Sequence, residues 1–247
     1  MKSILVVISA LVVAVSAHAG GRFVSYEVKG ALYEGYYAPA SDGAPVVLLI
    51  HDWDGLTDYE VKRSEMLARM GYAVFAADLF GAGVRPTRVE DKRQHTGELY
   101  QDRGKMRALI SGALEKAKSL GADTGRAVVM GYCFGGAAVL EYARSGADIK
   151  GFVSFHGGLR TPAGQDYAKT RGRLLILHGG ADSVVTMDDF ARLAGELEQA
   201  RVPHEMIVYG GAPHAFTVFG GDRYRKDVDR KSWRRFAEFL ADTLNKK

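Results

Sequence analysis

The chain has 247 residues, of which 47% are hydrophobic and 25% are charged, and its formal net charge is +4. Its length suits one α/β domain with a sizeable core, and no linker, repeat or low-complexity run divides it into two smaller ones. The charges are scattered along the sequence, so they point to neither a nucleic acid nor an anionic membrane as a partner.

The first nineteen residues have the pattern of a secretory signal peptide. Lys2 precedes an apolar stretch from Ile4 to Val15, and Ala17-His18-Ala19 forms a small-x-small cleavage site. The alternative is a transmembrane anchor, but a helix of this length spans only about 18 Å of the roughly 30 Å hydrocarbon core. We therefore expect cleavage after Ala19, export to the periplasm or beyond, and one domain over residues 20–247 without a membrane anchor.

After this leader, the pattern predicts an edge hairpin and then buried strands. Residues 23–29 and 31–38 alternate between apolar and polar side chains and are separated by Gly30, as is typical of an antiparallel hairpin. Short apolar runs, typical of strands covered on both faces, follow at residues 46–50, 73–77, 127–130, 151–155, 174–177 and 205–209.

Helical patterns lie between most of these runs. A capping box at residues 57–60 predicts the start of a helix that carries Met66, Leu67 and Met70 on one face and stops at Gly71. Further helices are expected at residues 99–120, 137–140, 190–197 and 233–244. Two stretches without a regular pattern, 81–97 and 160–172, are expected to be loops.

The alternation of strands and helices predicts the fold class. It indicates an α/β fold of three layers, with a mostly parallel sheet and helices on both of its faces. In such sheets ligands bind at the carboxyl ends of the strands.

The only cysteine, Cys133, lies in the sequence Gly131-Tyr132-Cys133-Phe134-Gly135, directly after a predicted strand. This is the pattern of a nucleophile elbow, with sulfur in the place of the usual serine oxygen. The sharp turn strains the nucleophile's backbone, and residues two positions away must lack a Cβ atom. At the start of the next helix, unpaired N–H groups and the helix dipole favour a thiolate. A lone cysteine is often a small buried hydrophobe, but glycines at both positions arise by chance in roughly one or two cases in a hundred.

Two further residues complete a candidate catalytic triad. Asp182 and His214 each follow a predicted strand, in the order nucleophile, acid, histidine that is found in the α/β-hydrolase fold. We expect His214 to accept the thiol proton and Asp182 to orient the imidazole. Backbone N–H groups of Phe134 and Trp53 are the candidates for an oxyanion hole.

Five motifs make the chain similar to the dienelactone hydrolase family of α/β-hydrolases over essentially all of the sequence after the leader. They are Gly-Tyr-Cys-Phe-Gly-Gly at 131–136, His-Asp-Trp-Asp-Gly-Leu at 51–56, Asp-Leu-Phe at 78–80, His-Gly-Gly-Ala-Asp at 178–182 and His-Ala-Phe at 214–216. The resemblance implies a hydrolase without cofactor or metal, whose Cys-Asp-His triad opens an activated ester, typically an enol lactone, through a thioester intermediate.

The resemblance also implies a thiol-activating carboxylate, which is usually Glu. Asp52 stands at that position and is one methylene shorter, and a role in capping local N–H groups is an equal alternative. His51 and His156 lie at strand ends and are expected to be structural.

The substrate contacts depart from the family. Its dienelactone-cleaving members hold the substrate carboxylate with arginines at positions that here carry Ala82 and Val218. Arg85 or Arg88 could replace the first arginine, and nothing obvious replaces the second. Since export also fits poorly with cytosolic ring degradation, we expect another ester, lactone or thioester as the substrate.

The side chains of Trp53, Phe80 and Tyr132 are candidates for an apolar pocket wall, although aromatic residues beside strand ends are as often part of the core.

Three alternatives stay open at this point. The same triad could transfer the acyl group to an alcohol or amine, or the chain could be a hydrolase scaffold that binds a ligand without catalysis. A metal enzyme is a weaker alternative because the histidines show no close ligand spacing. The sequence does not determine the oligomeric state, and a monomer is favoured.

Overall fold

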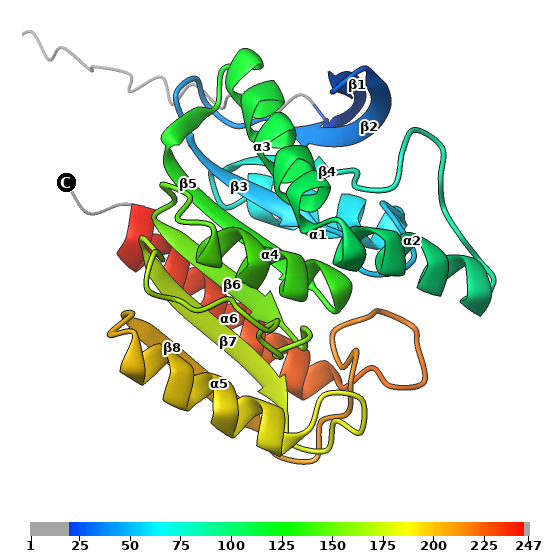
Figure 1. Ribbon diagram of the computed structural model, residues 1–247. Helices are drawn as coiled ribbons and strands as arrows, with labels where there is room; N and C mark the ends of the chain where they lie inside the picture. Colours follow the sequence, from blue (N-terminus) through cyan, green and yellow to red (C-terminus); the bar gives the residue numbers. More distant parts are fainter. Residues whose placement is uncertain (1–19, 245–247) are drawn as a thin grey trace, which may run out of the picture.

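The computed structural model describes residues 20–244, so the predicted signal peptide at residues 1–19 lies outside the described residues. Eight strands form one sheet: β1 (Arg22–Val28), β2 (Ala31–Ala38), β3 (Pro45–Ile50), β4 (Ala73–Ala77), β5 (Asp123–Tyr132), β6 (Gly151–Phe155), β7 (Arg173–Gly179) and β8 (His204–Tyr209). Their order is β1-β2-β4-β3-β5-β6-β7-β8 (Figure 1). The β1–β2 and β2–β4 pairs are antiparallel, and all other neighbours are parallel. The predicted edge hairpin and mostly parallel sheet are confirmed.

Helices cover both faces of this sheet. They are α1 (Asp58–Ala68), α2 (Val89–Gln101), α3 (Arg103–Ser119), α4 (Phe134–Arg144), α5 (Met187–Gln199) and α6 (Lys226–Leu244). In Figure 1 helices α3, α4 and α5 lie in front of the sheet, and α1 and α6 lie behind it. The two apolar clusters agree with this arrangement, because Leu109 and Leu140 belong to one and Leu67 and Phe236 to the other. The predicted three-layer α/β architecture is therefore confirmed.

The segment between β4 and β5 differs from the prediction. The expected single helix over residues 99–120 is two helices, and α2 begins at Val89, inside a stretch expected to be a loop. The break lies at Asp102, whose side chain caps α3 by accepting a hydrogen bond from the Lys105 N–H at 2.8 Å. The first turns of α2 carry no apolar stripe, because Thr96 and Leu99 are its only buried residues. Periodicity alone therefore could not reveal this helix.

Helix α1 starts as predicted. The Thr57 and Glu60 side chains form a complete capping box, and Leu67 is fully buried. The placement of Met70 on the buried face was wrong, because the helix ends at Ala68 and Met70 is 39% exposed. None of the helices between residues 20 and 244 is long and apolar enough to cross a membrane.

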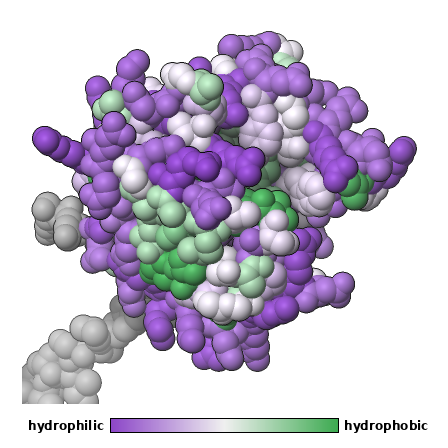
Figure 2. Space-filling model, turned by 60° about the horizontal axis from the view of Figure 1, so that its bottom comes forward, coloured by the Kyte–Doolittle hydropathy of each residue, from purple (hydrophilic) through white to green (hydrophobic). Residues whose placement is uncertain are grey.

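The strands bring the candidate site to one side of the molecule. The arrows of β6 and β7 point toward the lower right of Figure 1, where both strands end. Figure 2 turns the bottom of the molecule forward and shows a hydrophobic patch within a largely hydrophilic surface.

Candidate active site

The turn between β5 and α4 has the strained geometry that the sequence predicts. Cys133 has φ 50° and ψ −112°, in the region of positive φ that side-chain-bearing residues rarely adopt. A Cβ atom on Gly131 would collide with the backbone of Gly135, and a Cβ atom on Gly135 would collide with the Ile50 carbonyl. Both glycines are therefore required for this close approach of strand and helix, and the turn leaves Cys133 partly exposed.

The three residues of the candidate triad meet at the carboxyl ends of β5, β7 and β8. The Cys133 Sγ atom lies 3.1 Å from Nε2 of His214, and Nδ1 of the same ring lies 2.7 Å from Oδ2 of Asp182. The other oxygen of Asp182 accepts hydrogen bonds from the N–H groups of Val184 at 2.8 Å and Val185 at 2.9 Å. These bonds fix the carboxylate, and the carboxylate in turn fixes the imidazole.

The charges within this group support one another. Burial lowers the pKa of His214, but the hydrogen bonds from its ring to Asp182 and Cys133 outweigh burial and raise the pKa to about 9. Burial raises the pKa of Asp182, and its hydrogen bonds to His214 and Val185 outweigh that effect and lower it below the usual value. At neutral pH His214 is therefore an imidazolium, which donates from Nδ1 to the carboxylate and from Nε2 to the sulfur.

Asp52 lies near this group on the loop after β3. Its Oδ1 atom accepts a hydrogen bond from the Asp54 N–H at 2.8 Å, as expected of a capping carboxylate. Burial and the negative charge of Asp54 raise the pKa of Asp52 to about 6, whereas Lys92 and His214 act in the opposite direction. Asp52 is therefore close enough to His214 for their charges to interact.

Two other histidines at strand ends are held by hydrogen bonds. His51 is fully buried; its Nε2 accepts from the Leu79 N–H at 3.1 Å and its Nδ1 donates to the Asp52 carbonyl at 2.6 Å. Burial lowers the pKa of His51 to about 4, so the ring is neutral. His156 bonds to the Thr217 hydroxyl at 2.8 Å. Within the part of the chain that the structure describes, no group of three or more His, Cys, Asp or Glu residues could hold a metal ion.

The assignment of Tyr132 to the substrate pocket was wrong. Its side chain is fully buried, with its ring 5.0 Å from that of Tyr59 and 4.9 Å from that of Phe155, measured between centroids. Side chains of successive strand residues alternate between the two faces of a sheet, so Tyr132 points into the core behind the sheet while Cys133 turns outward.

The other predicted pocket residues lie around the site. The partly buried Phe80 ring lies 4.6 Å from the His51 ring and 5.7 Å from the Phe134 ring. Trp53 is also partly buried, and the Lys92 ammonium lies 5.2 Å from the centre of its ring. Arg85 instead donates to the Val84 carbonyl at 2.8 Å and lies 3.9 Å from Asp78, so its guanidinium is engaged at the end of β4.

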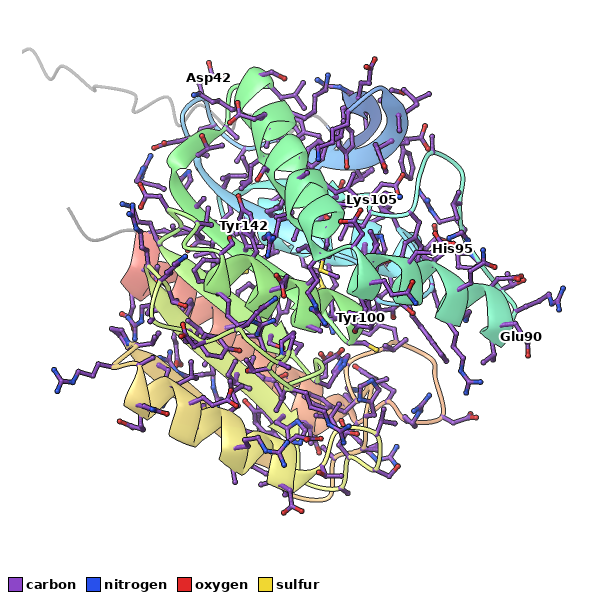
Figure 3. All side chains as sticks on the ribbon, viewed as in Figure 1. Asp42, Glu90, His95, Tyr100, Lys105 and Tyr142 are labelled. Atoms are coloured by element: carbon purple, nitrogen blue, oxygen red, sulfur yellow. The ribbon has the colours of Figure 1, made fainter. Side chains whose placement is uncertain are left out.

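Sequence reasoning missed Tyr100, at the end of α2. Figure 3 shows this side chain beside the start of α4, and its ring lies 5.5 Å from that of Phe134, the residue after Cys133. The signal that could have found it is Asp102, a favoured N-cap residue that marks the break between α2 and α3.

Several known proteins of similar sequence carry the name carboxymethylenebutenolidase. A putative carboxymethylenebutenolidase of Salmonella typhimurium is 26% identical over 225 residues, which cover 86% of this chain and 83% of the relative. Carboxymethylenebutenolidase 1 of Cupriavidus pinatubonensis is 29% identical over 182 residues, which cover 70% of this chain and 73% of the relative.

Two solved structures are similar to this chain over nearly all of its length. The structure of m3DLH has 31% sequence identity and a TM-score of 0.84, and the match covers 91% of this chain and 98% of that one. A dienelactone hydrolase-like promiscuous phosphotriesterase from metagenomic libraries has 27% identity and a TM-score of 0.83, with the same two coverages.

The sequence model of one family, the dienelactone hydrolase family, matches residues 33–244. That range includes the elbow, the acidic loop and the histidine loop that meet in the structure. The chain therefore belongs to the dienelactone hydrolase family of the α/β-hydrolase fold, and it is a hydrolase that acts on ester bonds.

Proposed function

We propose that this protein is an exported hydrolase that cleaves a carboxylic ester, lactone or thioester through Cys133, Asp182 and His214, with a thioester acyl-enzyme. The observation that carries the proposal is the continuous contact from Sγ to Nε2 at 3.1 Å and from Nδ1 to Oδ2 at 2.7 Å, at a strained turn. Export is supported by the leader pattern of the first nineteen residues.

In the acylation step the Cys133 thiolate attacks the carbonyl carbon of the ester. The carbonyl electron pair moves onto oxygen, where we expect the N–H groups of Phe134 and Trp53 to stabilise it. Phe134 is the first residue of α4, so its N–H has no partner within the helix. The oxyanion then collapses, the bond to the leaving alcohol breaks, and the His214 imidazolium gives that oxygen its proton.

In the deacylation step the neutral His214 takes a proton from water. The hydroxide attacks the thioester carbonyl, the carbon–sulfur bond breaks, and the acid leaves while Cys133 returns to the thiolate. Asp182 stabilises the imidazolium that forms in this step.

Asp52 is the proposed activating carboxylate. With a pKa of about 6 it is largely ionised at neutral pH, and its charge acts on His214. This interaction supports a role in the protonation of the triad, beside its hydrogen bond to Asp54.

Replacing the nucleophile tests the proposal. Cys133→Ala should lower kcat for p-nitrophenyl acetate by about a thousandfold or more, because no attacking atom is left. Cys133→Ser should also be far slower than the wild type, because a neutral hydroxyl needs stronger base assistance than a thiolate. Circular dichroism and Tm serve as controls for folding. Unchanged turnover by a folded Cys133→Ala variant would refute the proposal.

A further inference from the structure

A cavity of about 430 Å³ lies beside the candidate triad. Its lining residues neighbour the triad in sequence: Ala137 follows Cys133 by one helical turn, and Val184 and Val185 are the residues whose N–H groups bind Asp182. Ala137 also donates its N–H to the Cys133 carbonyl at 3.2 Å. The cavity is therefore a neighbour of the candidate triad, on the side of α4 and of the loop after β7.

Tyr100 connects the nucleophile to the charged end of the cavity. Its ring lies 5.5 Å from the Phe134 ring on one side, and the Arg103 guanidinium lies 5.6 Å from its centre on the other. Burial and the charge of Cys133 raise the pKa of Tyr100, whereas Arg103 lowers it. The phenol thus lies within electrostatic reach of both the sulfur and the guanidinium.

The charged residues that line the cavity are Arg103, Arg144, Arg160 and Asp189. Behind them the buried carboxylate of Glu141 is within 3.0 Å of Arg103, 2.6 Å of Arg107 and 3.1 Å of Arg144. One negative charge therefore faces three positive ones.

The same imbalance occurs at Asp189. Its Oδ1 atom accepts from Nε of Arg160 at 2.9 Å and from Nη1 of Arg192 at 3.3 Å. The Arg160 side chain is 75% exposed, so its remaining N–H groups can reach a ligand. Together, five guanidinium groups surround two carboxylates, and three of the five, those of Arg103, Arg144 and Arg160, line the cavity.

We propose that this cavity is an anion subsite in which Arg103 and Arg160 bind a carboxylate carried by the ester, while Tyr100 and the two valines contact its apolar part. The proposal rests on the proposed function. It places substrate recognition on α3 and on the loop after β6, whereas positions 82 and 218, where the family resemblance expects arginines, carry Ala and Val.

Matched pairs of esters test the subsite. In the first pair the acyl group differs, mono-p-nitrophenyl adipate against p-nitrophenyl hexanoate; in the second the alcohol differs, 4-acetoxybenzoate against its methyl ester. We expect the wild type to favour the charged member of at least one pair in kcat/KM by about tenfold, because one charge-assisted hydrogen bond has about that effect. Added salt should reduce this preference.

Two pairs of arginine variants identify the residues. Arg103→Met and Arg107→Met each remove one partner of Glu141, but only Arg103 lines the cavity. Arg160→Met and Arg192→Met each remove one partner of Asp189, and only Arg160 lines it. We expect Arg103→Met and Arg160→Met to lose most of the preference, because KM should rise much more for the charged ester than for the neutral one. The two control variants should keep it.

The outcomes separate the subsite from the chemistry. Equal kcat/KM for charged and neutral esters in both pairs, or equal losses in all four arginine variants, would overturn the subsite and leave the proposed function intact. Turnover retained by Cys133→Ala would instead overturn the proposed function. Turnover of the neutral ester by each arginine variant reports on its folding within the same experiment.

Discussion

At Cys133 the backbone and the sulfur are held by different neighbours. The Cys133 N–H donates to the Phe155 carbonyl at 3.0 Å, which fixes the turn to the end of β6. The sulfur is held by His214 alone among the hydrogen bonds of the triad. The position of the Cys133 backbone therefore depends on the sheet, whereas the position of its sulfur depends on the histidine loop.

Removing the imidazole separates these two dependences. Below about pH 9 His214 is protonated and stabilises the thiolate, so wild-type Cys133 should react rapidly with iodoacetamide at pH 7. In His214→Ala this stabilisation is gone, and the labelling rate at pH 7 should fall by about tenfold or more and recover as the pH rises past the usual thiol pKa of about 8.5. Mass spectrometry over a pH series measures the rate.

His204→Ala is the matched control, because His204 bonds to the Val202 carbonyl on the far end of β8 and should leave labelling unchanged. Equal labelling of the wild type and His214→Ala at pH 7 would contradict the pairing of Cys133 with His214.

For single residues, the sequence was informative where the residue type and its position after a strand indicated the same role. Cys133, Asp182 and His214 could be predicted because each follows a strand, and parallel strands bring such positions to one edge. The positions of Tyr132 and Tyr100 could not be predicted correctly. The position of the Tyr132 ring depends on which face of the sheet the side chain enters. The position of Tyr100 depends on the helix break at Asp102, which brings the end of α2 against Phe134.

Among the elements, helix α1 contains a buried acid, Glu60, whose two carboxyl oxygens have different surroundings. The Oε2 atom of Glu60 accepts from the N–H and the hydroxyl of Thr57, each at 2.8 Å. The Oε1 atom is buried and has no hydrogen-bond partner among the described residues. Burial and the charge of Asp52 raise the pKa of Glu60 to about 8. The helix start is therefore stabilised by a carboxyl group that resists ionisation.

This acid makes stability depend on pH. Between its ordinary pKa of 4.5 and about 8, the folded protein keeps a proton on Glu60 that the unfolded chain releases, so the free energy of unfolding should fall as the pH rises through this window. Glu60→Gln cannot ionise and should lose less stability between pH 5.5 and 8.5, by about 1 kcal/mol or more. Urea denaturation at the two pH values measures the difference.

Glu115→Gln provides the control, because Glu115 is an exposed residue of α3 and its replacement should not alter the pH dependence. If Glu60→Gln and the wild type lost the same stability over this range, Glu60 would have to be ionised in the folded protein. The capping box itself was evident from the sequence, but the isolation of its carboxylate from water was not, since burial is set by packing against distant segments.

Across the whole molecule, a buried ion pair joins the two helices behind the sheet. Nη2 of Arg63 in α1 lies 2.5 Å from Oδ1 of Asp229 in α6 and also donates to the Thr217 carbonyl at 3.0 Å. The guanidinium lies 4.2 Å from the ring centre of Phe219 and 4.8 Å from that of Trp233. Arg63 thereby connects α1, α6 and the loop that carries His214.

Breaking this pair should destabilise the protein strongly. Arg63→Met leaves Asp229 buried without its partner and should lower the free energy of unfolding by about 3–5 kcal/mol, measured by urea denaturation. Arg126→Met is the control, because it breaks an exposed pair with Asp123 and should cost about 1 kcal/mol or less. A loss for Arg63→Met as small as that of the control would show that the buried pair contributes little.

The three layers followed from the apolar runs, because each buried run needs helices on both faces. The pairing of Arg63 with Asp229 could not be predicted from the sequence. The two residues are 166 positions apart, and nothing in the local sequence of either residue distinguishes it from a solvated charge.

The position of α6 at residues 226–244 has a consequence for biosynthesis. Arg63 emerges from the ribosome well before the acid that neutralises it and before α6, which contributes Phe236 to the apolar cluster behind the sheet. The nascent chain therefore cannot use Arg63 to hold the loop that carries His214 until α6 has been synthesised.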